Sequence, residues 1–141
     1  MPTHQPVDVR VLIADDHQAL LERVVSLLAT EFTVVGAVHD GIELVEAEAA
    51  LVPDVLVVDI SMPRMTGLEA TARIRDRGSR ALVVYLTAHD EPDVVEAALA
   101  QGAKGYVNKT CLARDLVPAI HAALEGRFFV SHLDAPTRTT A

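Results

Sequence analysis

The sequence contains only one cysteine, Cys111, among its 141 residues. A single thiol cannot form an internal disulfide, and its presence fits a reducing compartment. Glycine and proline number 7 each, which is too few for a low-complexity segment. No run of about 18 apolar residues occurs, and residues 1–9 lack the basic start and apolar stretch of a secretory signal. We therefore expect a soluble, cytoplasmic protein that makes no membrane contact.

Basic residues are also scarce, because 12 lysines and arginines stand against 20 aspartates and glutamates and leave a net charge of −8. A broad surface for nucleic acid needs clustered lysine and arginine to neutralise phosphates. We therefore expect no direct nucleic-acid binding by this chain. Arginines do gather between residues 73 and 80, and we interpret them as a solvated helix face.

Half of the residues are hydrophobic, and the length suits one domain. Short runs rich in β-branched residues predict buried strands at 9–14, 33–38, 55–60, 81–86 and 105–107. Apolar stripes with helical spacing separate or follow these runs, at 20–28, 42–52, 94–99 and 112–124, and a weaker one falls at 68–77. Strand and helix therefore alternate five times along the chain.

This alternation predicts an α/β fold with a five-stranded parallel sheet and helices on both faces. Right-handed crossovers leave the flavodoxin-like strand order 2-1-3-4-5 as the common solution, with a switch point between strands one and three. We assign residues 1–7 to a flexible N-terminus, 8–127 to the domain and 128–141 to a polar tail or linker stub.

Polar side chains collect where the predicted strands end, which is where open parallel sheets carry function. Strand one ends in Asp15 and Asp16, strand three in Asp59, strand four in Thr87 and strand five in Lys109. Three carboxylates at one site raise each other's pKa and favour a hard divalent cation, Mg²⁺ first among them. With the lysine as a second positive charge, the set predicts phosphoryl transfer to the free carboxylate.

Each of these groups also has an ordinary structural interpretation. Asp15 or Asp16 taken alone would be the N-cap of the helix that follows. A lone Thr87 or Lys109 after a strand carries little meaning. The combination of four strand ends, each supplying a group that the others can use, is what favours a functional site.

Four segments carry a resemblance to a known family: VLIADDH (11–17), VLVVDISMPRMTGLE (55–69), VVYLTAHD (83–90) and GAKGYVNK (102–109). Together they are highly specific, and residues 8–127 resemble the receiver domain of bacterial response regulators. The last of these segments and the ending Gly126-Arg127-Phe128 look most like the LuxR/FixJ-type subfamily, which carries a helix-turn-helix after the receiver.

The resemblance implies a role for each acidic residue. Asp59 would accept a phosphoryl group from a sensor histidine kinase. Asp16 and Asp15 would bind Mg²⁺, and the backbone carbonyl of Ser61 would be a further protein ligand of the metal. The protein would catalyse its own phosphorylation and slow dephosphorylation, without being a metabolic enzyme.

The resemblance also implies how the signal would leave the site. Thr87 and Lys109 would contact the phosphoryl group, and Tyr106 would be an aromatic switch that turns inward as Thr87 moves. The face formed by the fourth helix, fifth strand and fifth helix would be reshaped. Phosphorylation would then favour a homodimer and control a DNA-binding output domain.

Some features depart from the family pattern. Thr110 follows Lys109 where many receivers have proline, and Pro118 falls inside the predicted last helix. The 141 residues contain no helix-turn-helix, so we expect a receiver cut before its output domain, with a stand-alone receiver that acts by protein contact as the alternative.

Two rival functions remain open from the residues. A phosphatase of the haloacid dehalogenase type wants a second acid two residues after its nucleophile, where Ser61 stands here. A flavin binder wants an uncharged phosphate loop after strand one, where Asp15 and Asp16 would repel the phosphate.

Overall fold

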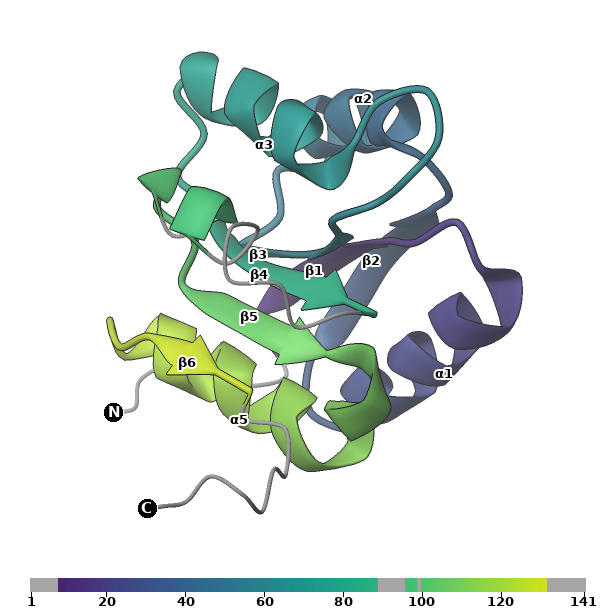
Figure 1. Cartoon of the computed structure of the whole chain (residues 1–141), viewed down its shortest axis with the longest axis vertical. Coiled ribbons are helices and arrows are strands. Elements are labelled where there is room, and N and C mark those ends of the chain that lie inside the picture. Colours follow the sequence, from purple (N-terminus) through teal and green to yellow (C-terminus); the bar gives the residue numbers. More distant parts are fainter. Residues whose placement is uncertain (1–7, 89–95, 99, 132–141) are drawn as a thin grey trace.

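The computed structural model describes residues 8–88, 96–98 and 100–131. Its helices and strands follow one another along the chain in the order β1 (Arg10–Ala14), α1 (Gln18–Ala29), β2 (Thr33–Val38), α2 (Gly41–Leu51), β3 (Val55–Asp59), α3 (Gly67–Asp76), β4 (Leu82–Thr87), β5 (Gly105–Asn108), the 3₁₀ turn η2 (Lys109–Cys111), α5 (Leu112–Leu124) and β6 (Phe129–Val130). Figure 1 shows this arrangement, with the sheet running through the middle of the molecule.

The strands form one parallel sheet in the order β2-β1-β3-β4-β5-β6. The predicted α/β class and the order 2-1-3-4-5 are confirmed for the first five strands. The predicted number of strands is wrong, because Phe129–Val130 add a sixth beside Gly105 and Tyr106 of β5. This strand is only two residues long, and it lies in the range that we assigned to a tail.

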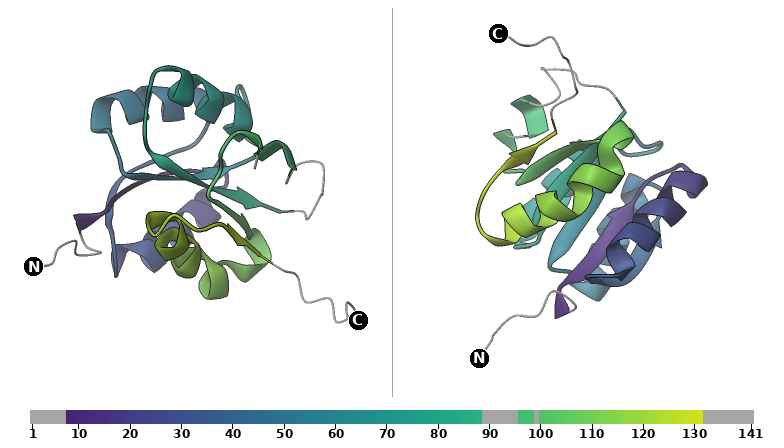
Figure 2. Two further views of the ribbon diagram at one scale, coloured as in Figure 1. Left: turned by 90° about the vertical axis from the view of Figure 1, so that its left-hand side faces the viewer. Right: turned by 90° about the horizontal axis from the view of Figure 1, so that it is seen from below.

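Helices cover both faces of the sheet, with α1 and α5 on one side and α2 and α3 on the other (Figure 2). Alternate residues of each strand point to opposite faces. In β1, for example, Ile13 packs toward α1 and α5 whereas Leu12 packs toward α2 and α3. Strand β3 is buried along its whole length, which accounts for its unbroken apolar run VLVV.

The helix predicted at 94–99 falls largely outside the described residues. Residues 96–98 are helical, and Ala98 is fully buried in the cluster beneath α3. Val94, Val95 and Leu99 lie outside the described residues. Among the described helices, none is long and apolar enough to cross a bilayer.

Capping explains why α3 forms despite its weak apolar stripe. Thr66 accepts a hydrogen bond from the Glu69 N–H at 3.1 Å, and the Glu69 carboxylate accepts one from the Thr66 N–H at 3.0 Å. This reciprocal capping box satisfies two backbone donors at the start of the helix. At the other end of the chain, α5 continues through Pro118, whose ring is exposed to solvent.

Candidate functional site

Asp59 ends β3 and is 3% exposed. Its Oδ1 accepts a hydrogen bond from the Ser61 N–H at 3.1 Å. The chain after it is held by Gly67, whose N–H donates to the Ile60 carbonyl at 2.9 Å. A Cβ at position 67 would lie 2.2 Å from the Asp59 carbonyl oxygen, so only glycine permits this close approach. The carboxylate is therefore fixed at the edge of the sheet by its own loop.

The loop after Asp59 is also tied to the start of α2. Arg64 donates from Nε and Nη2 to Oδ2 of Asp40, at 3.0 and 2.6 Å. Asp40 is the N-cap of α2, and its Oδ1 accepts from the Glu43 N–H at 2.9 Å. That backbone donor, followed by Arg64, lowers the pKa of Asp40. This pairing joins residues 24 positions apart, and nothing in the local sequence pattern indicates it.

Asp15 and Asp16 follow β1, which lies beside β3 in the sheet. Asp15 is fully buried, and its N–H donates to the Val38 carbonyl at 3.0 Å. The Asp16 side chain is 30% exposed. Neither carboxylate is the N-cap of α1, because that position is His17, which makes no side-chain cap. The ordinary capping interpretation of these residues is therefore not what the structure contains.

His17 joins the acidic cluster from the surface. Its Nδ1 lies 3.4 Å from Asp15 Oδ1 and 3.3 Å from Asp16 Oδ1, while the side chain remains 69% exposed. Its N–H also donates to Asp15 Oδ1 at 2.8 Å. The local sequence pattern does not indicate that this ring faces both carboxylates.

Lys109 bridges the two buried acids from the end of β5. Its Nζ lies 3.0 Å from Asp15 Oδ2 and 3.1 Å from Asp59 Oδ2, and its side chain is 12% exposed. Strand β4 separates β5 from β3, so the lysine stem spans the width of one strand to reach Asp59. The expected meeting of Asp15, Asp16, Asp59 and Lys109 at the carboxyl edge of the sheet is what the structure contains.

The cluster is short of positive charge. Burial, and next the negative charge of Asp15, raises the pKa of Asp59 from 3.8 to about 6, against the opposing effect of Lys109. Asp15 Oδ2 and Asp59 Oδ2 are buried and, within the described part of the chain, accept no hydrogen bond of good geometry, although the ammonium is close to both. One lysine does not fully compensate two buried carboxylates.

These residues fit a bound cation. Ligand atoms of Asp15, Asp16, His17 and Asp59 all lie within 4.8 Å of one another. Two buried carboxylate oxygens that lack good hydrogen bonds lie in this cluster, on Asp15 and Asp59. A donor set dominated by carboxylate oxygen suits a hard divalent ion. The site therefore has the composition and the unsatisfied charge that a metal would satisfy.

The remaining predicted site residues lie around this cluster. Thr87 ends β4 beside Asn108 and is 8% exposed. Tyr106 in β5 is 1% exposed, so its ring is buried in this structure. Ser61 lies two residues after Asp59 on the exposed loop. His89 lies outside the described residues.

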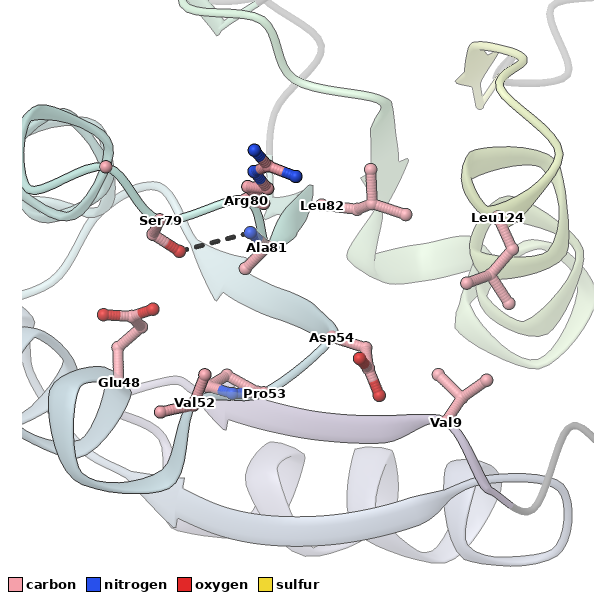
Figure 3. A pocket seen from close by; sticks show the side chains of 11 residues that line it. Val9, Glu48, Val52, Pro53, Asp54, Ser79, Arg80, Ala81, Leu82 and Leu124 are labelled. Atoms are coloured by element: carbon pink, nitrogen blue, oxygen red, sulfur yellow. Dashed lines mark hydrogen bonds between the residues drawn. The ribbon is translucent and has the colours of Figure 1, made fainter. Parts of the chain in front are cut away.

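A cavity of about 610 Å³ lies at the opposite end of the sheet (Figure 3). Its apolar lining includes Val9, Leu82 and Leu124. The two carboxylates that border it are already engaged: Glu48 pairs with Arg77 at 3.1 Å, and Asp54 accepts from the Arg10 N–H at 2.8 Å. The cavity therefore contributes nothing to the chemistry at the carboxyl edge.

Comparison with known families identifies the family that has this fold and this site. Residues 11–121 match the model of the response regulator receiver domain. The chain belongs to this family. The resemblance carried by the four sequence segments is thereby confirmed, and the receiver domain accounts for most of the chain.

The receiver domain has relatives among transcriptional regulators. It is 37% identical over 133 residues to a probable transcriptional regulatory protein NarL of Mycobacterium tuberculosis, covering 93% of this chain and 62% of that protein. It is 36% identical over 129 residues to the nitrate/nitrite response regulator protein NarL of Escherichia coli, covering 89% and 59%. The chain thus spans about three fifths of the length of these relatives.

Solved structures agree with this assignment. The signal receiver domain of the putative response regulator NarL from Mycobacterium tuberculosis superposes with a TM-score of 0.80 at 37% identity, covering 86% of this chain and all of that one. A two-component response regulator of the LuxR family from Aurantimonas gives a TM-score of 0.80 at 32% identity, covering 85% and 87%. The predicted LuxR-type relationship is confirmed by these neighbours.

Proposed function

We propose that this receiver domain is a phosphoacceptor switch in which Asp59 takes a phosphoryl group from the phosphohistidine of a sensor histidine kinase. The observation that carries the proposal is the placing of Lys109 between the buried carboxylates of Asp15 and Asp59, at 3.0 and 3.1 Å. A purely structural acid at the end of a strand would not need a second buried acid and a lysine beside it.

The transfer balances between donor and acceptor, and it consumes no further reactant. An Asp59 carboxylate oxygen forms a bond to phosphorus as the P–N bond of the phosphohistidine breaks, and the imidazole leaves with the electron pair. Lys109 offsets negative charge that gathers on the phosphoryl oxygens. In the slow hydrolysis that resets the switch, water attacks phosphorus and the Asp59 carboxylate leaves with the electron pair of the broken P–O bond. The products are inorganic phosphate, which carries the oxygen of the water, and a proton that passes to phosphate or to solvent.

Mg²⁺ is the cation that we propose for the acidic cluster. Asp15, Asp16, Asp59 and the backbone carbonyl of Ser61 would hold it. When bound, it supplies positive charge to the transferring phosphoryl group. The two buried carboxylate oxygens without good hydrogen bonds support this assignment.

Output would follow from new contacts of the phosphoryl group. Thr87 would donate a hydrogen bond to one of its oxygens, and Lys109 would exchange the Asp59 carboxylate for the phosphoryl group. We propose that Tyr106 responds to the movement of Thr87, and that the face of the fourth helix, β5 and α5 changes with it. The relatives are transcriptional regulators, so this face would act, in the cytoplasm, through a homodimer to control a DNA-binding domain.

Phosphorylation of the purified protein tests the proposal directly. Acetyl phosphate with Mg²⁺ is expected to add the mass of one phosphoryl group to the wild-type protein and none to Asp59→Asn. Addition of EDTA before the donor should abolish labelling. An unchanged wild-type mass, or equal labelling of Asp59→Asn, would overturn the proposal.

A further inference from the structure

Ser131 is a buried junction between the end of the domain and the strand that carries Lys109. It follows β6 directly and is 6% exposed. Its N–H donates to the Tyr106 carbonyl at 2.9 Å. Its hydroxyl accepts from the Asn108 N–H at 3.0 Å and donates to Asp115 Oδ2 at 2.7 Å. One serine thus joins β6, β5 and α5.

The hydroxyl substitutes for a missing part of the sheet. Pairing between β5 and β6 ends at Tyr106 and Val130. No carbonyl of β6 therefore reaches the next backbone N–H of β5 that points toward β6. That donor is the N–H of Asn108, which is 4% exposed. A buried N–H left without a partner is costly, and the serine hydroxyl satisfies it. Asp115, 5% exposed on α5, fixes the direction of the hydroxyl by accepting its hydrogen bond.

Asn108 is the residue before Lys109, and its own side chain shapes the turn that follows. Its Oδ1 accepts from the Thr110 N–H at 2.9 Å and from the Thr110 hydroxyl at 2.7 Å. The backbone on one side of Lys109 is therefore held by Ser131, and the backbone on the other side is held by Asn108. From within this turn, the Lys109 side chain extends to Asp15 and Asp59.

We propose that Ser131 is a positioning residue for Lys109 and couples the phosphorylation site to the chain that leaves the domain after β6. This proposal rests on the phosphoacceptor role of Asp59. When Lys109 exchanges the Asp59 carboxylate for phosphoryl oxygens, the shift of its backbone passes to Asn108 and so to Ser131. Loss of the Ser131 hydroxyl loosens the backbone that places Lys109 beside Asp59, so it also slows phosphorylation.

Substitution of Ser131 tests this coupling, with Ser79 as the matched control. Ser79 accepts a backbone hydrogen bond from the Ala81 N–H at 3.2 Å at the opposite end of the sheet. Ser131→Ala is expected to lower the maximal rate of labelling by acetyl phosphate roughly three- to tenfold, with the half-saturating Mg²⁺ concentration unchanged. Ser131→Thr, which keeps the hydroxyl, should restore most of the rate, and Ser79→Ala should label like the wild type.

Amide hydrogen exchange supplies a readout that does not depend on labelling. In the unphosphorylated protein, Ser131→Ala is expected to speed exchange of the Asn108 amide while leaving the amides of β1 and β3 unchanged. Beryllofluoride with Mg²⁺ should change exchange at residues 129–131 of the wild type, and this response should be lost in Ser131→Ala. If Ser131→Ala does not fold, Asp115→Asn takes its place with the same expected direction.

The outcomes separate this proposal from the one on which it rests. Suppose that the wild type is labelled but that Ser131→Ala changes neither the labelling rate nor the hydrogen exchange of the Asn108 amide. This result would overturn the role of Ser131 alone. A wild-type protein that cannot be labelled would overturn the phosphoacceptor function, and the coupling with it. Equal rate losses in Ser131→Ala and Ser79→Ala would point to general destabilisation and also overturn the proposal.

Discussion

Lys109 Nζ lies 3.1 Å from Asp59 Oδ2 and reaches it from two strands away in the sheet. The same ammonium lies 3.0 Å from Asp15 Oδ2, so one cation stands between two buried anions. The single positive charge of Lys109 balances only one of these two carboxylates. Most of the predictions below depend on this excess of negative charge.

Removal of the lysine charge should destabilise the fold. We expect Lys109→Met to lower the free energy of unfolding at pH 7 by about 2 to 4 kcal/mol, because it leaves two buried carboxylates facing each other. Urea denaturation without metal measures this loss. Lys104→Met, on a half-buried lysine one residue before β5, should cost much less, and equal losses in the two variants would contradict this account.

The contribution of Asp59 to the stability of the metal-free protein should fall as pH rises from about 4 to about 6. The pKa of Asp59 is raised to about 6 in the fold, from an ordinary value of 3.8, so the folded state holds this proton more tightly than the unfolded chain does. Ionisation at higher pH then costs about 2 to 3 kcal/mol.

Asp59→Asn should remove this slope and make the metal-free protein more stable than the wild type at pH 7. Thermal unfolding across pH in EDTA measures both effects, and Asp54→Asn, at the opposite end of the sheet, is the control. A wild-type stability that rises through this pH range in parallel with Asp59→Asn would contradict the assignment.

Asp16 should matter for the metal and little for the fold. Its side chain is 30% exposed, and Lys109 pairs with the other two acids. We expect Asp16→Ala to weaken Mg²⁺ binding by at least about tenfold, in the range seen when a residue that supports a metal site is lost, with the metal-free unfolding midpoint nearly unchanged. Isothermal titration with Mg²⁺ gives the affinity, and Asp76→Ala, on the exposed end of α3, should bind like the wild type.

Gly67 should tolerate no side chain. A Cβ there would lie 2.2 Å from the Asp59 carbonyl oxygen and 2.8 Å from Val58 Cγ1, so the loop must move away from β3. We expect Gly67→Ala to cost about 1 to 3 kcal/mol and to displace Asp59. Urea denaturation measures the cost, and labelling by acetyl phosphate reports the displacement. Wild-type values for both would show that the loop absorbs the methyl group.

Much of the fold follows from patterns that act over short stretches. The buried run VLVV of β3 and the apolar stripe of α5 predict those elements because hydrophobic spacing directly reflects burial. The joint presence of Asp15, Asp59 and Lys109 at one edge follows from parallel strand order, which needs only the alternation of elements. For these residues, local sequence and global topology point to the same arrangement.

What could not be predicted depends on contacts between distant residues. Strand β6 is two residues long, too short for any alternating pattern. It is held against β5 by backbone pairing and by the hydrogen bond from the Asn108 N–H to the Ser131 hydroxyl. The Arg64–Asp40 pair similarly joins a loop to a helix cap 24 residues earlier. Such pairs leave no periodic trace in the sequence, because each is specified by only two side chains and the fold that brings them together.

The parallel direction of β6 fixes where the chain is heading when it passes Ser131. If the domain ended at α5, the polypeptide would be released near the start of the sheet strands, on the side of the cavity beside Val9 and Leu124. Strand β6 instead carries it back along β5 toward Asn108. Ser131, the last residue that the structure describes, therefore lies at the same edge of the sheet as Asp59.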